Sequence, residues 1–182
     1  MPGQVPRCLK TKRLLLRCPR PEDGPALYAA ILDSKDRLRS WFNWIRGAVL
    51  TPERSRSAAR LARWQFMAGR ELQFYLFLRS TKQLIGVCGL CRPDWSVPQF
   101  EVRYWLRTGW EGHGYMMEAV TAVVNLACEQ LGAKRVEIRC QPENKSSIAL
   151  AQRLGFKRNK CVHTHGGLPD EIIFARTAKY LG

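Results

Sequence analysis

The stretch Glu111-Gly112-His113-Gly114-Tyr115-Met116 decides the fold, because it joins a strand-like run to a helix-like run. Two glycines at i and i+2 allow a turn whose N–H groups face one concavity, with a helix N-terminus behind them. Such amides bind phosphate oxygens without a lysine. The stretch lacks the Gly-Lys-Ser/Thr of a P-loop, and Met117 stands where a dinucleotide fingerprint needs its third glycine. It therefore predicts a cradle for the pyrophosphate of another kind of cofactor.

The segments on either side of this turn predict a mixed sheet. Three short strands are expected before it, over 74–78, 84–90 and 100–106. Their short connections predict an antiparallel meander. After the turn, apolar residues recur at helical spacing from Met116 to Leu131, Gly132 ends the run, and a strand follows over 135–140. This strand–helix–strand order implies one parallel pair, so the fold class is α/β (α+β) with a mostly antiparallel sheet.

Outer elements surround this centre. We expect a strand over 11–18, helices opening at Arg20 and Thr51, a short helix over 35–42, a helix over 144–154, and last strands over 156–162 and 171–175. At 182 residues the chain is expected to be a single domain over 11–178, with a loose basic tail at 1–10 and a C-terminal end at 179–182.

The composition excludes several classes of protein. Hydrophobic residues make up 46% and charged residues 25%, which excludes a disordered chain, a collagen-like fibre and a small disulfide scaffold. The longest uncharged stretch, 119–128, is far shorter than the ~20 residues of a membrane span. Residues 1–10 have no apolar core, so no signal peptide is expected there.

The charge balance points to an anionic partner or to a solvated basic surface. Thirty Lys and Arg against fifteen Asp and Glu give a net charge of +15, which attracts nucleic acid, ribosomes and acidic proteins. Arg56, Arg60 and Arg63 share one face of a predicted helix. That face is either solvated or directed at an anion or a substrate.

The seven cysteines indicate a reducing compartment, and we expect the protein in the cytoplasm. Cys88 and Cys91 have the spacing of a half zinc site, but the other cysteines form no second close pair. In a strand these two side chains point to opposite faces. They are interpreted as small core residues, and no metal is expected.

Asn144 and Ser147 open the helix expected over 144–154. Asn144 is a good helix cap, which is one interpretation of it. Ser147 lies in the first turn, on the side that could face a cofactor. A hydroxyl there could donate a proton to a leaving group.

Together these features resemble the GNAT superfamily of N-acetyltransferases, and within it the ribosomal-protein (Rim-type) group. Residues 111–116 align with the Gln/Arg-x-x-Gly-x-Gly/Ala motif, with Glu111 in place of its first residue and Met116 in place of its last. The stretches that match the Rim-type pattern are 101–106, 112–119, Asn144-x-x-Ser147, Gly155-Phe156 and 167–170. The resemblance covers roughly residues 11 to 178.

The resemblance implies a GNAT fold, with the parallel pair splayed at the site of acetyl-CoA, the acetyl donor. Trp105 and Leu106 would lie at the splay, where backbone groups pair with the pantetheine arm. The loop Glu111, Gly112, His113, Gly114, Tyr115 and Met116 would bind the pyrophosphate, with the Glu111 carboxylate directed away from it. Asn144 would contact the pantetheine, and Ser147 would protonate the departing CoA thiolate.

The implied acceptor is a primary amine, and within the Rim-type group it is the N-terminal α-amine of a protein such as an acidic ribosomal protein. That amine has a pKa of ~7.7–8, so a base helps its attack on the thioester but is not essential. Glu101 is the candidate base, acting through a water. Its alternative is a strand carboxylate paired with Arg103 or Arg139, and His163 and His165 are further candidate bases.

Two other functions stay open at this point. One is an acetyltransferase for small-molecule amines, and the other is a basic nucleic-acid-binding module, suggested by the charge and the six tryptophans. The module gives no reason for the glycine turn and Ser147 to occur in this order. The sequence names neither the acceptor nor the oligomeric state, for which a monomer and a homodimer are both compatible.

Overall fold

The computed structural model describes residues 5–45, 49–162 and 170–177. Its strands are β1 (Cys8–Lys10), β2 (Leu14–Arg17), β3 (Leu72–Leu78), β4 (Leu84–Asp94), β5 (Gln99–Leu106), β6 (Arg135–Cys140), β7 (Lys157–Val162) and β8 (Glu171–Thr177). Its helices are α1 (Gly24–Asp33), α2 (Lys35–Trp41), α3 (Pro52–Met67), α4 (Tyr115–Asn125) and α5 (Lys145–Arg153). Short turns of other helix types are η1 (Pro21–Asp23), η2 (Asn43–Ile45) and η3 (Leu126–Gln130).

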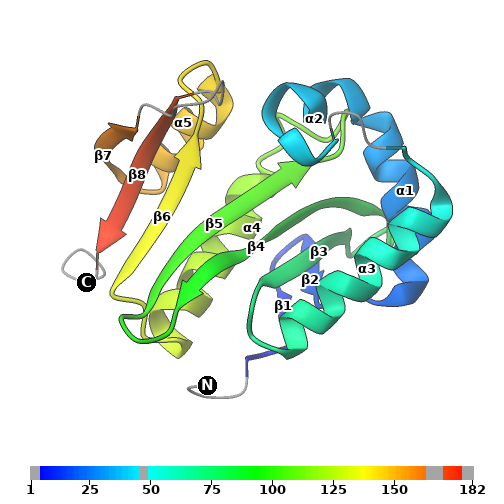
Figure 1. Cartoon of the computed structure of the whole chain (residues 1–182), viewed down its shortest axis with the longest axis horizontal. Helices are drawn as coiled ribbons and strands as arrows, with labels where there is room; N and C mark the ends of the chain where they lie inside the picture. The colour runs from blue at the N-terminus through cyan, green and yellow to red at the C-terminus, as the bar shows by residue number, and fades with distance from the viewer. Residues whose placement is uncertain (1–4, 46–48, 163–169, 178–182) are drawn as a thin grey trace.

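The eight strands form one open sheet in the order β1-β2-β3-β4-β5-β6-β8-β7. Neighbouring strands are antiparallel except for β5 and β6, which run parallel. The predicted meander is β3-β4-β5, and α4 makes the predicted crossover between the parallel strands (Figure 1). The expected mixed sheet with a single parallel pair is therefore confirmed for the described residues.

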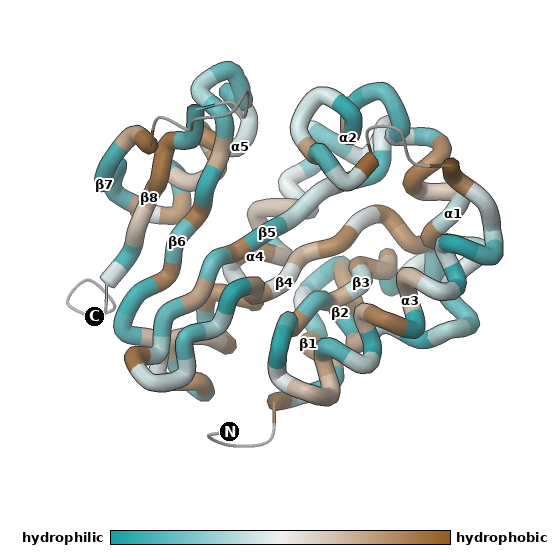
Figure 2. The backbone as a smooth tube through the Cα atoms, viewed as in Figure 1, coloured by the Kyte–Doolittle hydropathy of each residue, from teal (hydrophilic) through white to brown (hydrophobic). Residues whose placement is uncertain are grey.

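Helices cover both faces of the sheet. The larger core lies between the sheet and α4, and its buried residues include Phe100, Val120 and Ala151 of α5. A second core lies on the opposite face, where α1 and α2 pack Leu27, Ile31 and Leu38 onto β3 and β4. In Figure 2 the hydrophobic colour gathers on β4 and its neighbours, whereas α2 and α3 are mostly hydrophilic.

The ends of α3 and α4 follow from their sequences. Thr51 Oγ1 accepts a hydrogen bond from Arg54 N at 3.2 Å, and Pro52 takes the first helical position, as the cap signal predicts. The helix predicted from Met116 to Leu131 is α-helical only to Asn125. It continues as the π-helical turn η3, in which Leu131 N donates to Leu126 O.

Part of the predicted N-terminal tail is a strand. Cys8–Lys10, placed in a loose tail by the sequence, pairs with Leu15–Arg17 as edge strand β1. This three-residue strand has no alternation long enough to reveal it, and its register with β2 holds it in place. Among the described residues, no helix combines the length and the apolarity that crossing a membrane requires.

Candidate active site

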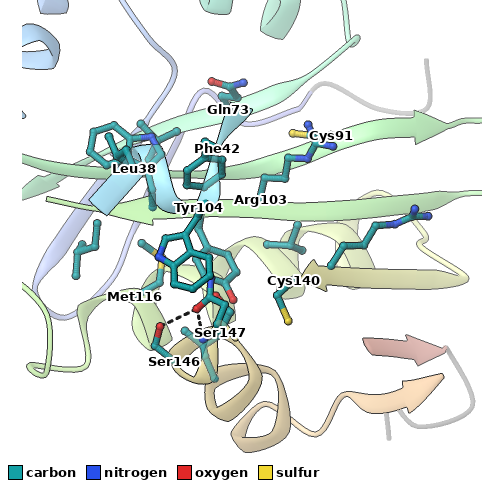
Figure 3. A pocket seen from close by; sticks show the side chains of 18 of the residues that line it. Leu38, Phe42, Gln73, Cys91, Arg103, Tyr104, Met116, Cys140, Ser146 and Ser147 are labelled. Atoms are coloured by element: carbon teal, nitrogen blue, oxygen red, sulfur yellow. Dashed lines mark hydrogen bonds between the residues drawn. The ribbon is translucent and has the colours of Figure 1, made fainter. Parts of the chain in front are cut away.

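Strands β5 and β6 diverge at the centre of the site. Their pairing ends at Val102 and Ile138, so among the described strands the β6-facing edge of residues 103–106 has no partner. A cavity of about 1000 Å³ opens there, lined by β5, the turn before α4, the start of α5, and α2 and α3. Figure 3 shows Tyr104, Met116, Ser146 and Ser147 gathered around one part of this cavity.

Trp105 and Leu106 lie on the unpaired stretch of β5, as the resemblance implies. On their other edge they pair with Val87 and Gly86 of β4, so only the edge towards β6 is free to bind a ligand. Their side chains point to opposite faces of the sheet, because Trp105 packs on the second core and Leu106 on the larger one. Both residues line the cavity.

The glycine turn has the backbone that an anion cradle needs. Gly112 and Gly114 have φ of +79° and +75°, in the left-handed region that favours glycine. A Cβ at Gly112 would meet nothing within 4 Å, so the space in front of the turn is open. Gly114 is the N-cap of α4, which puts the free N–H groups of the first helical turn beside the cavity.

Arg13, which precedes β2, binds both this turn and α4. Its Nη1 donates to the His113 carbonyl at 2.8 Å, and its guanidinium lies 4.4 Å from the centre of the Tyr115 ring. Its Nε pairs with Glu118 Oε2 at 2.6 Å, and its backbone N donates to Glu118 Oε1 at 2.7 Å. Burial raises the pKa of Glu118, but the hydrogen bonds from Thr11 and Arg13 outweigh it and leave the pKa below its ordinary value.

The Glu111 carboxylate is paired with an arginine and with a backbone N–H. Its Oε1 forms an ion pair with Arg37 of α2, and its Oε2 accepts a hydrogen bond from Gly109 N at 2.8 Å. The carboxylate that replaces the motif's Gln or Arg is therefore compensated by a neighbouring arginine. It also links α2 to the turn, so the two walls of the cavity are tied together.

Asn144 and Ser147 meet at the start of α5. Asn144 Oδ1 accepts hydrogen bonds from Ser147 N at 3.1 Å and Ser146 Oγ at 2.9 Å (Figure 3). The cap predicted for Asn144 is confirmed. Its side-chain nitrogen makes no hydrogen bond with the described residues, and both Asn144 and Ser147 line the cavity.

Glu101 reaches the cavity from the paired part of β5 and is only 6% exposed. Its Oε1 accepts from Arg103 Nε at 2.6 Å, and its Oε2 lies 3.3 Å from Arg92 Nη1 and 3.6 Å from Arg139 Nε. The predicted ion pairing is therefore present. Oε2 accepts no hydrogen bond from any described residue. This buried oxygen therefore has ion-pair partners but no hydrogen-bond donor among the described residues.

Two buried thiols in the cavity are unreactive by environment. Burial raises the pKa of Cys91 to about 12 and of Cys140 to about 11, so neither is a thiolate at neutral pH. The side chains of Cys88 and Cys91 lie on different faces of the sheet. Cys88 pairs with Tyr104 of β5, and Cys91 pairs with Glu101. Within the described ranges, no cluster of three or more His, Cys, Asp or Glu side chains could hold a metal ion.

The structure adds residues that the sequence did not single out. Tyr104 lines the cavity with a buried hydroxyl, and the part of the cavity beside α2 and η2 is lined by Leu38, Trp41, Phe42 and Trp44. Tyr104 fits the apolar alternation of its strand, so the pattern marks it as a core residue. Only the rule that a buried tyrosine hydroxyl needs a partner could have singled it out.

Other predicted features lie outside the cavity. His163 and His165 fall outside the described residues. Arg56, Arg60 and Arg63 do not line the cavity, which α3 faces with Ala58, Leu61, Ala62 and Gln65. Arg63 donates to the Pro19 carbonyl at 3.4 Å instead. The arginine stripe therefore does not face the cavity, and its attraction of an anion or a substrate stays a prediction.

A family model described as an acetyltransferase (GNAT) domain matches residues 13–157. The chain belongs to the GNAT acetyltransferase family. It is similar to an uncharacterised N-acetyltransferase, p20, of Bacillus licheniformis, at 27% identity over 60% of this chain and 64% of that protein. It is also 26% identical to the ribosomal-protein-serine acetyltransferase of Escherichia coli, over 75% of this chain and 74% of that protein.

A solved structure of RimL, a ribosomal-protein α-N-acetyltransferase in complex with coenzyme A, has the same fold. It superposes with a TM-score of 0.83 at 21% identity, over 95% of this chain and 97% of that one. The resemblance seen in the sequence and the fold class it implied are confirmed. The GNAT chain is an acetyl-CoA-dependent acetyltransferase.

Proposed function

We propose that this acetyltransferase transfers the acetyl group to the N-terminal α-amine of a protein, such as an acidic ribosomal protein. For the transfer to an amine, one observation carries the proposal: Ser147 and Glu101, whose Oε2 accepts no hydrogen bond from a described residue, line the same cavity at the splay of β5 and β6. A hydroxyl on the donor side and a carboxylate on the acceptor side are the two groups that direct transfer to an amine needs.

The residues on the donor side fit acetyl-CoA. The turn at Gly112 and Gly114 offers free N–H groups and open space to a pyrophosphate. The free edge of Trp105 and Leu106, with the Asn144 side-chain nitrogen, suits the amides of a pantetheine arm. His113, Tyr115 and Met116 complete the loop, and Glu111 supports it through Arg37. Acetyl-CoA supplies the activated acetyl thioester.

The residues on the acceptor side fit a neutral amine. Glu101 Oε2 accepts the proton that the amine loses as its nitrogen bonds to the acetyl carbon, through one water. The C–S bond then breaks, its electron pair goes to sulfur, and Ser147 gives that sulfur a proton. No covalent enzyme intermediate is needed, in keeping with the high pKa of the cysteines at the site.

The protein acceptor is supported by relatives rather than by geometry. Relatives named for acetylating ribosomal proteins include the serine enzyme and a uS5-alanine enzyme, which is 26% identical over 86% of this chain. The net charge of +15 suits an acidic or ribosome-bound acceptor. Such an acceptor would place the reaction in the cytoplasm.

The test is acetyl-CoA turnover with matched acceptors. Peptides with an acidic, a neutral and a basic sequence after the same first residue are compared with N-terminally blocked versions and with small primary amines. We expect a free N-terminus to be required and the acidic peptide to have the highest kcat/KM. If only small amines are acetylated, the proposed protein acceptor is wrong and the enzyme is a small-molecule amine acetyltransferase. RNA binding without any acetyl transfer would contradict the proposal altogether.

A further inference from the structure

We infer that Tyr104 is a positioning residue for Ser147, whose proton it directs towards the departing sulfur. The inference rests on the proposed role of Ser147 as the acid. The hydroxyl of Tyr104 is buried and makes no hydrogen bond with the described residues, although its residue lines the cavity. Unpartnered buried hydroxyls are rare, because each loses its hydration without compensation. Such an exception needs an explanation.

Ser147 is the polar group that faces this hydroxyl. The two side chains come from β5 and from the first turn of α5, and in Figure 3 they lie in the same part of the cavity. Burial raises the pKa of Tyr104, and the Ser147 hydroxyl lowers it in part. The two hydroxyls therefore lie near one another without the geometry of a hydrogen bond.

The phenol of Tyr104 is protonated and can therefore act as the donor towards Ser147. Because the pKa of Tyr104 is raised, the phenol keeps its proton and can donate it in a hydrogen bond to Ser147 Oγ. An oxygen that accepts this bond points its own O–H away from Tyr104, and in this inference it points towards the sulfur. The same bond stabilises the negative charge that Ser147 gains as its proton moves to sulfur. Ser147 afterwards recovers a proton from solvent.

Tyr104→Phe tests this with almost no change in shape. We expect kcat to fall by ~10-fold or somewhat more, which is less than the ~10²–10⁴-fold typical of removing a direct acid or base. The Kd for acetyl-CoA should change little. The melting temperature should stay level or rise, because an unpartnered polar group is removed. Tyr28→Phe, which removes a phenol hydroxyl of α1 outside the cavity, is the matched control for an unchanged rate.

The decisive measurement is the double variant with Ser147→Ala. If Tyr104 acts through Ser147, Tyr104→Phe has no further effect on kcat in the Ser147→Ala background. An equal fall in both backgrounds would overturn the inference, as would a loss of acetyl-CoA affinity that explains the whole fall. The cycle uses whichever amine the enzyme acetylates fastest. A failure of the protein-acceptor proposal, with small amines as substrates, therefore leaves this result readable.

Discussion

At the scale of single residues, Glu101 and Glu137 are two similar buried carboxylates that can be compared directly. They are register partners on β5 and β6, they are 6% and 5% exposed, and both pair with arginines. Both oxygens of Glu137 accept hydrogen bonds, from Arg135 and Arg139. Of the two, only Glu101 lines the cavity and has an oxygen that accepts no hydrogen bond from a described residue. The two carboxylates therefore share a structural role and differ in access to a substrate.

We predict that Glu101→Gln lowers kcat/KM by ~10²-fold or more, because it removes the group that takes the amine's proton. Both variants should lower the melting temperature by a similar amount, because each change breaks the arginine pairs of a buried carboxylate. Glu137→Gln should keep its activity. Steady-state kinetics and thermal unfolding of both variants check this. Equal activity of the two variants would reduce Glu101 to a structural ion pair.

The sequence predicted Ser147 and Glu101 through their place in a family pattern, while Tyr104 was missed for a physical reason. Alternation along a strand reports which face a residue occupies, and a tyrosine on the core face satisfies that pattern. Whether its hydroxyl finds a partner depends on α5, which lies more than forty residues later in the chain. Such a contact exists only once the tertiary structure is formed.

At the scale of elements, a comparison of two glycines separates the binding role of the turn before α4 from the effect of backbone strain. Gly112 and Gly132 both have positive φ, of +79° and +65°, and a Cβ at either would meet nothing within 4 Å. An alanine at either position therefore meets the same strain, of ~1–2 kcal/mol. Only Gly112 lines the cavity.

Acetyl-CoA at ~100 times its Kd should stabilise the wild-type protein by ~2.7 kcal/mol. We predict that Gly112→Ala loses most of this stabilisation, because its methyl group enters the space of the pyrophosphate, and that Gly132→Ala keeps it. Thermal unfolding with and without acetyl-CoA gives both numbers. A full shift in Gly112→Ala would place the pyrophosphate elsewhere.

The link between Arg13 and Glu118 predicts how stability depends on pH. The folded pKa of Glu118 is lowered, so its contribution is fully present above the ordinary glutamate value of 4.5 and is lost as pH falls through the folded pKa. The wild type should therefore melt above Glu118→Gln by a constant margin at neutral and mildly acidic pH. Below ~4.5 the margin should shrink. A margin that grows on acidification would contradict the assignment.

Most elements were predictable because their signals are local. Thr51-Pro52 marks the start of α3, Asn144 caps α5, and helical spacing marks α4. β1 and the π-helical turn η3 were not predicted. Three residues carry no usable period, and a π turn changes the hydrogen bonding without interrupting the apolar spacing. Similarly, the splay of β5 and β6 is a property of the paired strands and of neither sequence alone.

At the scale of the whole molecule, some of the basic side chains that give the net charge of +15 lie outside the cavity. Arg56 and Arg60 are exposed on α3, do not line the cavity and form no ion pair with the described residues. They can attract an acidic acceptor over distance without touching its N-terminus. Arg158 and Lys160 on edge strand β7 are a second exposed basic pair and serve as the matched control.

We predict that the field speeds the encounter with an acidic protein acceptor and leaves the chemical step unchanged. The Debye length falls from ~30 Å at 0.01 M salt to ~10 Å at 0.1 M, so kcat/KM should fall over that range while kcat stays level. Reversing Arg56 and Arg60 to Glu should raise KM for the acidic acceptor at low salt, more than reversing Arg158 and Lys160, and spare a neutral peptide. If activity towards every acceptor is indifferent to salt, the charge serves solubility. If the chain instead binds RNA with a steep salt dependence that both reversals weaken, the basic surface has a nucleic-acid partner.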